Sequence, residues 1–511
     1  MKEIYKIAKK IDLKKKNLIL YGDYSAKIKN YNPKVNKSKL ILVSALNPTS
    51  SGEGKTTISI GLADSLAYLN KKVCLCLREP SMGPVFGVKG GAVGGGNAKI
   101  VPEDDINLHF NGDFHAITYL NNLISAYIDN HIYYGNQLNI DANKILFHRC
   151  IDINDRALRE IEINKEKLKN NVTHNENFAI TPASELMSIF CLSKNFDDFE
   201  QRCNNILIAY SKDNTPIYFY QLNKSDCIKK LMNNAFLPNL VQTLNYTPCL
   251  VHGGPFANIS IGTSSYTSIK TASNLANYVI TEAGFGFDLG GEKFLDIMCR
   301  NNNLNPNIIV LVCTIKALKN YEGNSIETGF EFVKYYHKII SKVFNKKCIF
   351  VINRFDSDTN DDIRKFVNLC NEYEIPFSVC NSYEKGKLGA INLANKVIEF
   401  CNDLKTPLKF AYKLEDDLET KVLDLSKNVY GVKNVKYSQK AREKIALYGN
   451  LLDNLPIVVA KTQYSLTDDK NYLKLPTDEN IIIVTDIELK NGAGFILIKT
   501  NKILLMPGLP E

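Results

Sequence analysis

Long apolar runs, paired cysteines and tryptophan are all missing from this sequence of 511 residues. No apolar run approaches the ~18 residues that a membrane-spanning helix needs, so we expect no membrane contact. The thirteen cysteines are scattered without a CxxC pair, which argues against a zinc site and against a disulfide framework. We therefore expect a protein of the reducing cytoplasm.

Basic charge is in excess at one end of the chain only. The net charge is +9, and residues 1–40 contain twelve lysines against three acidic residues. The remainder is electrically balanced, which argues against a nucleic-acid-binding surface spread over the protein. We interpret the lysine-rich segment as a solvated amphipathic helix, with attraction of polyanionic substrates as the alternative. It lacks the continuous apolar core of a secretory signal.

Runs rich in Val, Ile and Leu alternate with helical patterns along the chain. Such runs are typical of parallel strands buried on both faces; they are LILVSAL, KVCLCL, NILIAY, YVIT, NIIVLVCT and KCIFVIN. The pattern predicts an α/β fold whose parallel sheet is covered by helices on both faces, with smaller α/β lobes. We predict one α/β domain over 1–300, a second α/β domain over 301–410 and a C-terminal α/β lobe over 411–511.

The first of these strands leads into NPTSSGEGKTT, which is similar to a phosphate-binding loop. In the pattern GxxxxGK[ST], a strand, a loop and a helix bring backbone N–H groups and the positive helix end together. Lys55 can then reach the terminal phosphates of a nucleotide, and the Thr56 hydroxyl can bind Mg²⁺. Thr49 replaces the first glycine of the pattern, so a plain strand-to-helix turn is the alternative.

The next strand is followed by the glycine-rich stretch LREPSMGPVFGVKGG. Sites in parallel α/β folds lie at the carboxyl ends of strands. The guanidinium of Arg78 suits a phosphoryl or acyl-phosphate group there, because its fork can hold two oxygens at once. A surface ion pair between Arg78 and a neighbouring acid is the alternative.

Ten ordered segments give the chain a more specific resemblance, which covers it from about residue 21 to residue 510. They are PTSSGEGKTT, LREPSMGPVFGVKGGAVGGG, DINLHFNGDFHAI, ITPASELM, PNLVQT, VHGGPFANI, TEAGFGFDLGGEKF, INRFDSDT, AKTQYSLTDD and LLMPGLP. With these segments the chain resembles the formate–tetrahydrofolate ligase family, also called formyltetrahydrofolate synthetases.

The resemblance implies an ATP-dependent ligase that forms 10-formyltetrahydrofolate. Formate would attack the γ-phosphate of ATP, and the resulting formyl phosphate would pass its formyl group to tetrahydrofolate, with release of ADP and phosphate. The site would hold ATP, a metal and a positive clamp on the transferring group. The resemblance also implies Mg²⁺, an activating monovalent cation (K⁺ or NH₄⁺) and a cytoplasmic homotetramer.

The resemblance further assigns roles to individual positions. Arg78 would hold formyl phosphate, and Glu79 with Asp113 would bind the monovalent cation. Phe355 and Tyr383 would enclose the pterin ring of the folate. The implied ATP-binding residues are Thr49, Ser50, Ser51, Gly52, Glu53, Gly54, Lys55, Thr56 and Phe285.

The chain departs from the family pattern around the implied folate site. Tyr383 stands where the family usually has tryptophan and offers less stacking area. Lys387, Ile261 and Lys316 replace the usual glycine, histidine and arginine. The ATP half of the reaction is therefore expected intact and the folate half altered. Two alternatives stay open: a P-loop ATPase or kinase that phosphorylates another small carboxylate, and a non-catalytic nucleotide or folate binder.

Overall fold

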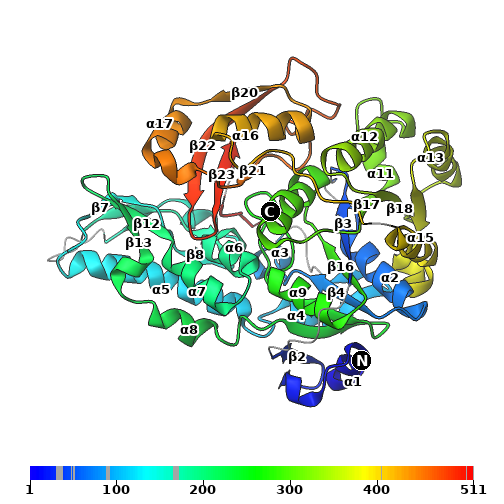
Figure 1. The fold of residues 1–511 in the computed structure, drawn as a ribbon, viewed down its shortest axis with the longest axis horizontal. Coiled ribbons are helices and arrows are strands. Elements are labelled where there is room, and N and C mark those ends of the chain that lie inside the picture. Colours follow the sequence, from blue (N-terminus) through cyan, green and yellow to red (C-terminus); the bar gives the residue numbers. More distant parts are fainter. Residues whose placement is uncertain are drawn as a thin grey trace.

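The computed structural model describes residues 1–29, 38–47, 49, 52–87, 93–164, 172–403, 405–501, 503 and 505–509. Its centre is a 12-stranded sheet, which Figure 1 shows behind the helices at the right. The main strand order is β1 (Leu18–Tyr21), β2 (Ser25–Ile28), β14 (Asn239–Thr243), β15 (Pro248–Val251), β4 (Val73–Leu77), β16 (Tyr278–Glu282), β3 (Lys39–Ala45), β17 (Ile308–Cys313), β18 (Cys348–Asn353) and β19 (Phe377–Cys380).

Most of this sheet is parallel. All neighbouring strands from β15 to β19 pair parallel, whereas β14, β2 and β1 add an antiparallel edge. The short hairpin of β5 (Gly94–Gly95) and β6 (Ala98–Val101) joins β14. The predicted α/β class with a large parallel sheet is therefore confirmed.

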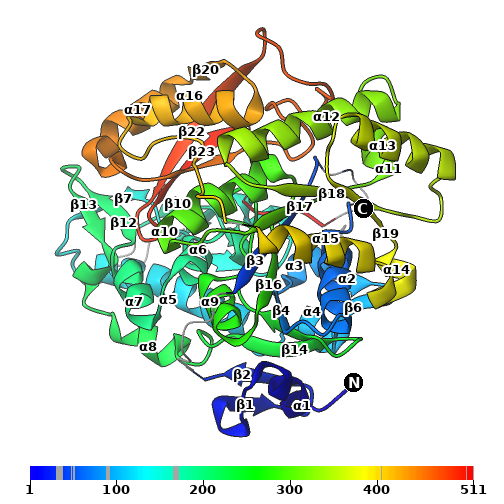
Figure 2. The ribbon, with the colours of Figure 1, turned by 45° about the vertical axis from the view of Figure 1, so that its right-hand side comes forward.

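Alternate residues of the parallel strands enter two separate cores, because successive side chains point to opposite faces of a sheet. Ile41 and Val43 pack with helices α2 (Lys55–Tyr68) and α15 (Ile391–Asn402), which lie side by side in Figure 2. Leu40 and Leu42 belong to the core that contains α9 (Tyr266–Leu275) and α12 (Ile326–Lys338). Helices thus cover both faces, as the continuous apolar runs predict.

One predicted strand of the parallel sheet lies elsewhere. NILIAY forms β12 (Leu207–Ser211), which pairs antiparallel with β13 (Pro216–Tyr218) and β7 (Ile140–Ile145) in a separate three-stranded sheet. The physical reason is the short connection KDNT between β12 and β13, because a hairpin loop can join only antiparallel strands. The assignment of this run to the parallel sheet was wrong.

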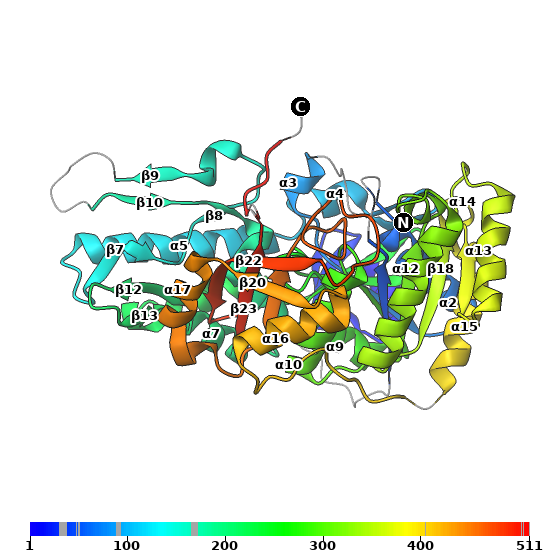
Figure 3. The same cartoon turned by 90° about the horizontal axis from the view of Figure 1, so that it is seen from above.

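The C-terminal strands form a sheet of their own, seen in orange and red in Figure 3. Its order is β20 (Asn434–Tyr437), β22 (Ile481–Lys490), β23 (Phe495–Thr500) and β21 (Ile457–Ala460). By contrast, the strands on either side of residue 300 share the large sheet. The three-domain division stays a prediction.

The lysine-rich N-terminal segment begins with the short helix α1 (Ile4–Ala8), in which Ile4 and Ile7 are buried. The lysines that the structure describes in this segment are mostly exposed, but Lys27 on β2 is 0% exposed. The interpretation of the segment as a solvated amphipathic helix was therefore wrong in part, because β1 and β2 follow the short helix and Lys27 forms a buried ion pair described below. Across the described ranges, no helix is both long enough and apolar enough to cross a membrane.

Candidate functional site

The candidate residues gather at one edge of the large sheet. Parallel strands place their carboxyl ends together, and five of the six adjacent strands from β4 to β19 carry a polar or aromatic residue of interest there. The residues are Thr49–Thr56 after β3, Arg78 after β4, Glu282 at the end of β16, Phe355 after β18 and Tyr383 after β19. Ser50 and Ser51 lie outside the described residues.

The loop between β3 and α2 is braced by the ends of the neighbouring strands. The Glu53 carboxylate accepts hydrogen bonds from the Thr49 N–H (2.7 Å) and from the Thr314 hydroxyl (2.6 Å). Asn353 donates to the Glu53 carbonyl at 3.1 Å. Gly54 caps α2 at φ 72°, and a Cβ there would lie 2.2 Å from the Asn353 side-chain nitrogen. Only glycine fits this turn without rearrangement.

Lys55 and Thr56 form the first turn of α2, beside the end of β16. The Thr56 hydroxyl lies 2.9 and 3.1 Å from the two oxygens of Glu282. Burial lowers the pKa of Lys55, and the charge of Glu282 opposes that shift. Glu282 was missed as an individual candidate, although it ends a buried strand inside the quoted segment TEAGFG. Its position at the strand end is the signal that could have found it.

Arg78 faces the glycine-rich turn that follows β16. Its Nη1 donates to the Pro255 carbonyl at 3.1 Å, and its buried Nε has no hydrogen-bond partner among the described residues. A Cβ on Gly284 would lie 2.9 Å from Nη2 of Arg78, so the chain passes close to the guanidinium. Phe285 follows with φ 56°, a conformation that is rare for a bulky residue and marks strain.

Glu79 and Asp113 lie in a buried cluster with Lys27. The Lys27 ammonium is 2.6 Å from Asp113 Oδ1, with both side chains 0% exposed, and Asn239 donates to Asp113 Oδ2 at 2.6 Å. Burial, reinforced by the charge of Asp113, raises the pKa of Glu79 well above its usual value. Within the described chain, Glu79 Oε2 is buried without a hydrogen-bond partner. The resemblance assigned Glu79 and Asp113 to one site, but the sequence did not reveal that Lys27 lies in the same cluster.

The two aromatic candidates are exposed, with Phe355 at 44% and Tyr383 at 59%. They follow the neighbouring strands β18 and β19, so the structure places them at the same edge of the sheet. The β5–β6 hairpin lies against Tyr383: a Cβ on Gly95 would be 2.9 Å from its ring, and the Asn97 N–H donates to its carbonyl at 2.8 Å.

The other departures from the family pattern are spread out. Lys387 lies with its ammonium over the ring of Tyr68, 5.3 Å from the centroid. Ile261 is completely buried, whereas Lys316 is exposed on α11 (Ile315–Leu318). These positions therefore do not form one altered surface around Tyr383.

These features define an α/β protein that gathers basic, carboxylate and aromatic side chains at the carboxyl edge of a mostly parallel sheet, where proteins of this class bind their ligands. A family model described as formate–tetrahydrofolate ligase matches residues 1–511. A formate–tetrahydrofolate ligase of Campylobacter concisus (strain 13826) is 46% identical, covering 100% of this chain and 94% of the relative. A formate–tetrahydrofolate ligase of Campylobacter curvus (strain 525.92) is 45% identical, covering 99% and 94%. The chain belongs to the formate–tetrahydrofolate ligase family.

Proposed function

We propose that this protein is a formate–tetrahydrofolate ligase that couples ATP hydrolysis to the formation of 10-formyltetrahydrofolate. The proposal rests mainly on four side chains that lie at the same carboxyl edge of the large sheet: Lys55, Thr56, Arg78 and Glu282. Family membership over the whole chain supports the same reaction. A charged clamp of this kind suits phosphoryl transfer, in which catalysis is mostly positioning and electrostatic stabilisation.

The proposed chemistry has two steps. A formate oxygen attacks the γ-phosphorus of ATP, and the bond to the leaving ADP oxygen breaks. The folate amine then attacks the formyl carbon, the carbon–oxygen bond to phosphate breaks, and the amine loses its proton. Residues Thr49–Thr56 would surround the triphosphate, with Lys55 on its terminal phosphates. Arg78 would hold the phosphate oxygens of formyl phosphate through the side of the guanidinium that carries the unpartnered Nε.

The Thr56 hydroxyl and the Glu282 carboxylate fit a magnesium site. Mg²⁺ takes oxygen ligands and is usually bound by one or two protein groups together with substrate phosphates. The two side chains are already within hydrogen-bond distance of each other, so both could bind the same Mg²⁺ ion. When bound, Mg²⁺ would neutralise charge on the phosphates. Phe285, on the turn after β16, would border the nucleotide and formate pocket.

Glu79 and Asp113 would bind the activating monovalent cation, K⁺ or NH₄⁺. The buried and unpartnered Oε2 of Glu79 supports this assignment, because an uncompensated buried oxygen is costly. Phe355 and Tyr383 would stack on the pterin ring. We extend to this chain the homotetrameric assembly and the cytoplasmic location that the resemblance implies, and we assign nucleotide binding to residues 1–300.

An ADP-release assay tests the proposed function. ADP would be measured with formate, with and without tetrahydrofolate, and 10-formyltetrahydrofolate would be followed in parallel. Lys55→Ala and Glu282→Gln should each lower turnover by at least ~100-fold, because each removes a charged group from the phosphate site. Lys229→Ala, on the exposed face of α8 (Asp226–Met232), is the matched control and should be unaffected.

The same assay separates the alternatives. Formate-dependent ADP release that tetrahydrofolate does not increase would favour an acyl-phosphate former without folate. ATP binding without turnover on formate or other small carboxylates would favour a non-catalytic binder. Near-normal turnover of Lys55→Ala would show that residues 49–56 do not hold the triphosphate.

A further inference from the structure

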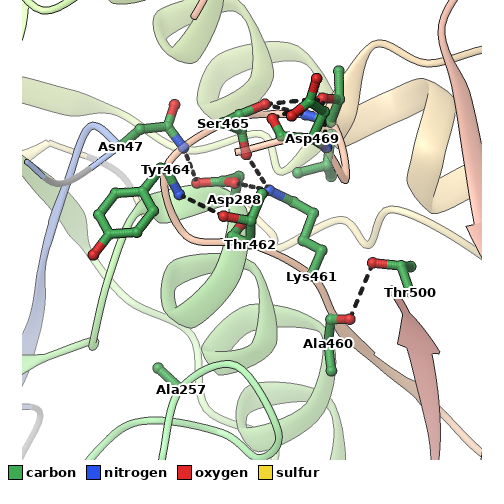
Figure 4. Close-up of polar contacts among 12 residues, drawn as sticks. Asn47, Ala257, Asp288, Ala460, Lys461, Thr462, Tyr464, Ser465, Asp469 and Thr500 are labelled. Carbon is green, nitrogen blue, oxygen red and sulfur yellow. Dashed lines mark hydrogen bonds and ion pairs between the residues drawn. The ribbon is translucent and has the colours of Figure 1, made fainter. Parts of the chain in front are cut away.

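A buried ion pair connects the C-terminal sheet to the turn beside the phosphate loop. Lys461 directly follows β21, and Asp288 lies in the π-helical turn Phe287–Gly291 after β16. The Lys461 ammonium is 2.6 Å from Asp288 Oδ2, and both side chains are 0% exposed. Figure 4 shows the two side chains reaching toward each other from these separate segments.

The second oxygen of Asp288 is engaged with the start of the phosphate loop. Asn47, between β3 and Thr49, donates to Asp288 Oδ1 at 3.2 Å. The Tyr336 hydroxyl lies 3.0 Å from the same oxygen and 3.0 Å from Asn47 Oδ1. Burial, together with the charge of Asp288, raises the pKa of Tyr336 well above its usual value, so the hydroxyl stays a donor. Asp288 therefore joins three segments that are distant in sequence.

Lys461 also makes several contacts with the C-terminal part of the chain. Its ammonium also donates to the carbonyls of Ser465 (2.5 Å) and Thr462 (3.3 Å), and it lies 5.1 Å from the ring centroid of Tyr430. Three acceptors use the three hydrogens of the ammonium. The loop after β21 therefore surrounds the Lys461 ammonium, whose ionic partner Asp288 lies at the carboxyl edge of the large sheet.

We propose that Asp288 and Lys461 are positioning residues for the nucleotide site. Their ion pair would hold Asn47 and the turn after β16 in the arrangement that lets the phosphate loop surround a triphosphate. A buried ion pair adds little net stability over well-packed apolar residues, so a positional role accounts better for its presence. The inference rests on the proposed function, because it requires that Thr49–Thr56 bind ATP.

Nucleotide affinity tests this role directly. Lys461→Met, Asp288→Asn and Tyr336→Phe would be compared with the wild type by calorimetric titration with a non-hydrolysable ATP analogue and by steady-state kinetics. The first two variants should weaken nucleotide binding by about tenfold or more, because small displacements of a preorganised site are costly. Tyr336→Phe should weaken it less, and the KM for tetrahydrofolate should stay within about twofold in all three.

Controls separate positioning from general stability. Lys490→Met breaks a largely buried ion pair with Glu488 in the same C-terminal sheet (2.9 Å) and should lower the melting temperature without changing nucleotide affinity. Lys461→Arg keeps the charge and should restore most of the affinity lost in Lys461→Met. If Lys461→Met does not fold, Asp288→Asn and Tyr336→Phe decide the question.

The outcomes also separate this inference from the proposed function. If Lys55→Ala binds the analogue as the wild type does, the proposed nucleotide site is wrong. If Lys55→Ala loses affinity while folded Asp288→Asn, Lys461→Met and Tyr336→Phe all bind within about twofold of the wild type, the positioning role is overturned. A selective loss of nucleotide affinity in the ion-pair variants supports it.

Discussion

Replacing Lys27 by methionine would leave two carboxyls buried beside each other without the ammonium that compensates them. Lys27 and Asp113 are both 0% exposed at 2.6 Å, and Glu79 is 5% exposed. Methionine has a similar length and a flexible stem, so the change mainly removes charge. Removing one partner of a buried ion pair typically costs about 3–5 kcal/mol. We expect a loss of stability of that size in Lys27→Met.

Differential scanning calorimetry measures this loss. At about 2–4 °C per kcal/mol for a large domain, the melting temperature should fall by roughly 6–20 °C. Ammonium chloride should recover part of this shift, because NH₄⁺ can occupy the place of the lysine ammonium between the carboxyls. Lithium chloride at the same ionic strength is the comparison. Lys72→Met is the matched control, because its partner Asp12 is 77% exposed and a surface ion pair contributes only about 0–1 kcal/mol.

Two results would contradict this reasoning. A melting temperature of Lys27→Met within about 2 °C of the wild type would mean that Lys27 and Asp113 are hydrated rather than buried. An equal response to lithium and ammonium would mean that the carboxyl cluster does not select a larger monovalent cation, and it would weaken the assignment of Glu79 and Asp113.

Three further predictions follow from the same structure. Tyr383→Ala should raise the KM for tetrahydrofolate by about tenfold or more if ring stacking contributes roughly 1–3 kcal/mol, with the KM for ATP unchanged in the same steady-state assay. Burial, reinforced by the charge of Asp113, raises the pKa of Glu79 above its usual 4.5, so the folded protein keeps this proton to higher pH than the unfolded chain does. Stability should therefore fall as pH rises above 4.5, and in lithium buffers the urea midpoints of Glu79→Gln should depend less on pH than those of the wild type. Burial lowers the pKa of His148 from 6.5 to about 4, so stability should fall by roughly 3 kcal/mol as pH drops through that window, and His148→Gln should lose less in an acid-unfolding series.

Much of the fold was predictable because buried parallel strands leave a local signature. The runs at β3, β4, β16, β17 and β18 are continuously apolar, since both faces of the sheet are covered. The rule that sites lie at the carboxyl ends of such strands then located Arg78 and Lys55 at one edge. NILIAY has the same local signature, and only its pairing partners show that it lies in another sheet.

The sequence by itself therefore determined the fold class, the family and the glycine-rich loops, because apolar periodicity and ordered motifs are local properties of the chain. Only the tertiary structure decided which charges are buried together. Glu282 meets Thr56 across 226 residues, Lys461 meets Asp288 across 173, and Lys27 meets Asp113 across 86. In sequence a charged residue such as Lys27 or Lys461 resembles a solvated surface group. Its ionisation and its role depend on burial and on partners that the folded chain brings to it from distant segments.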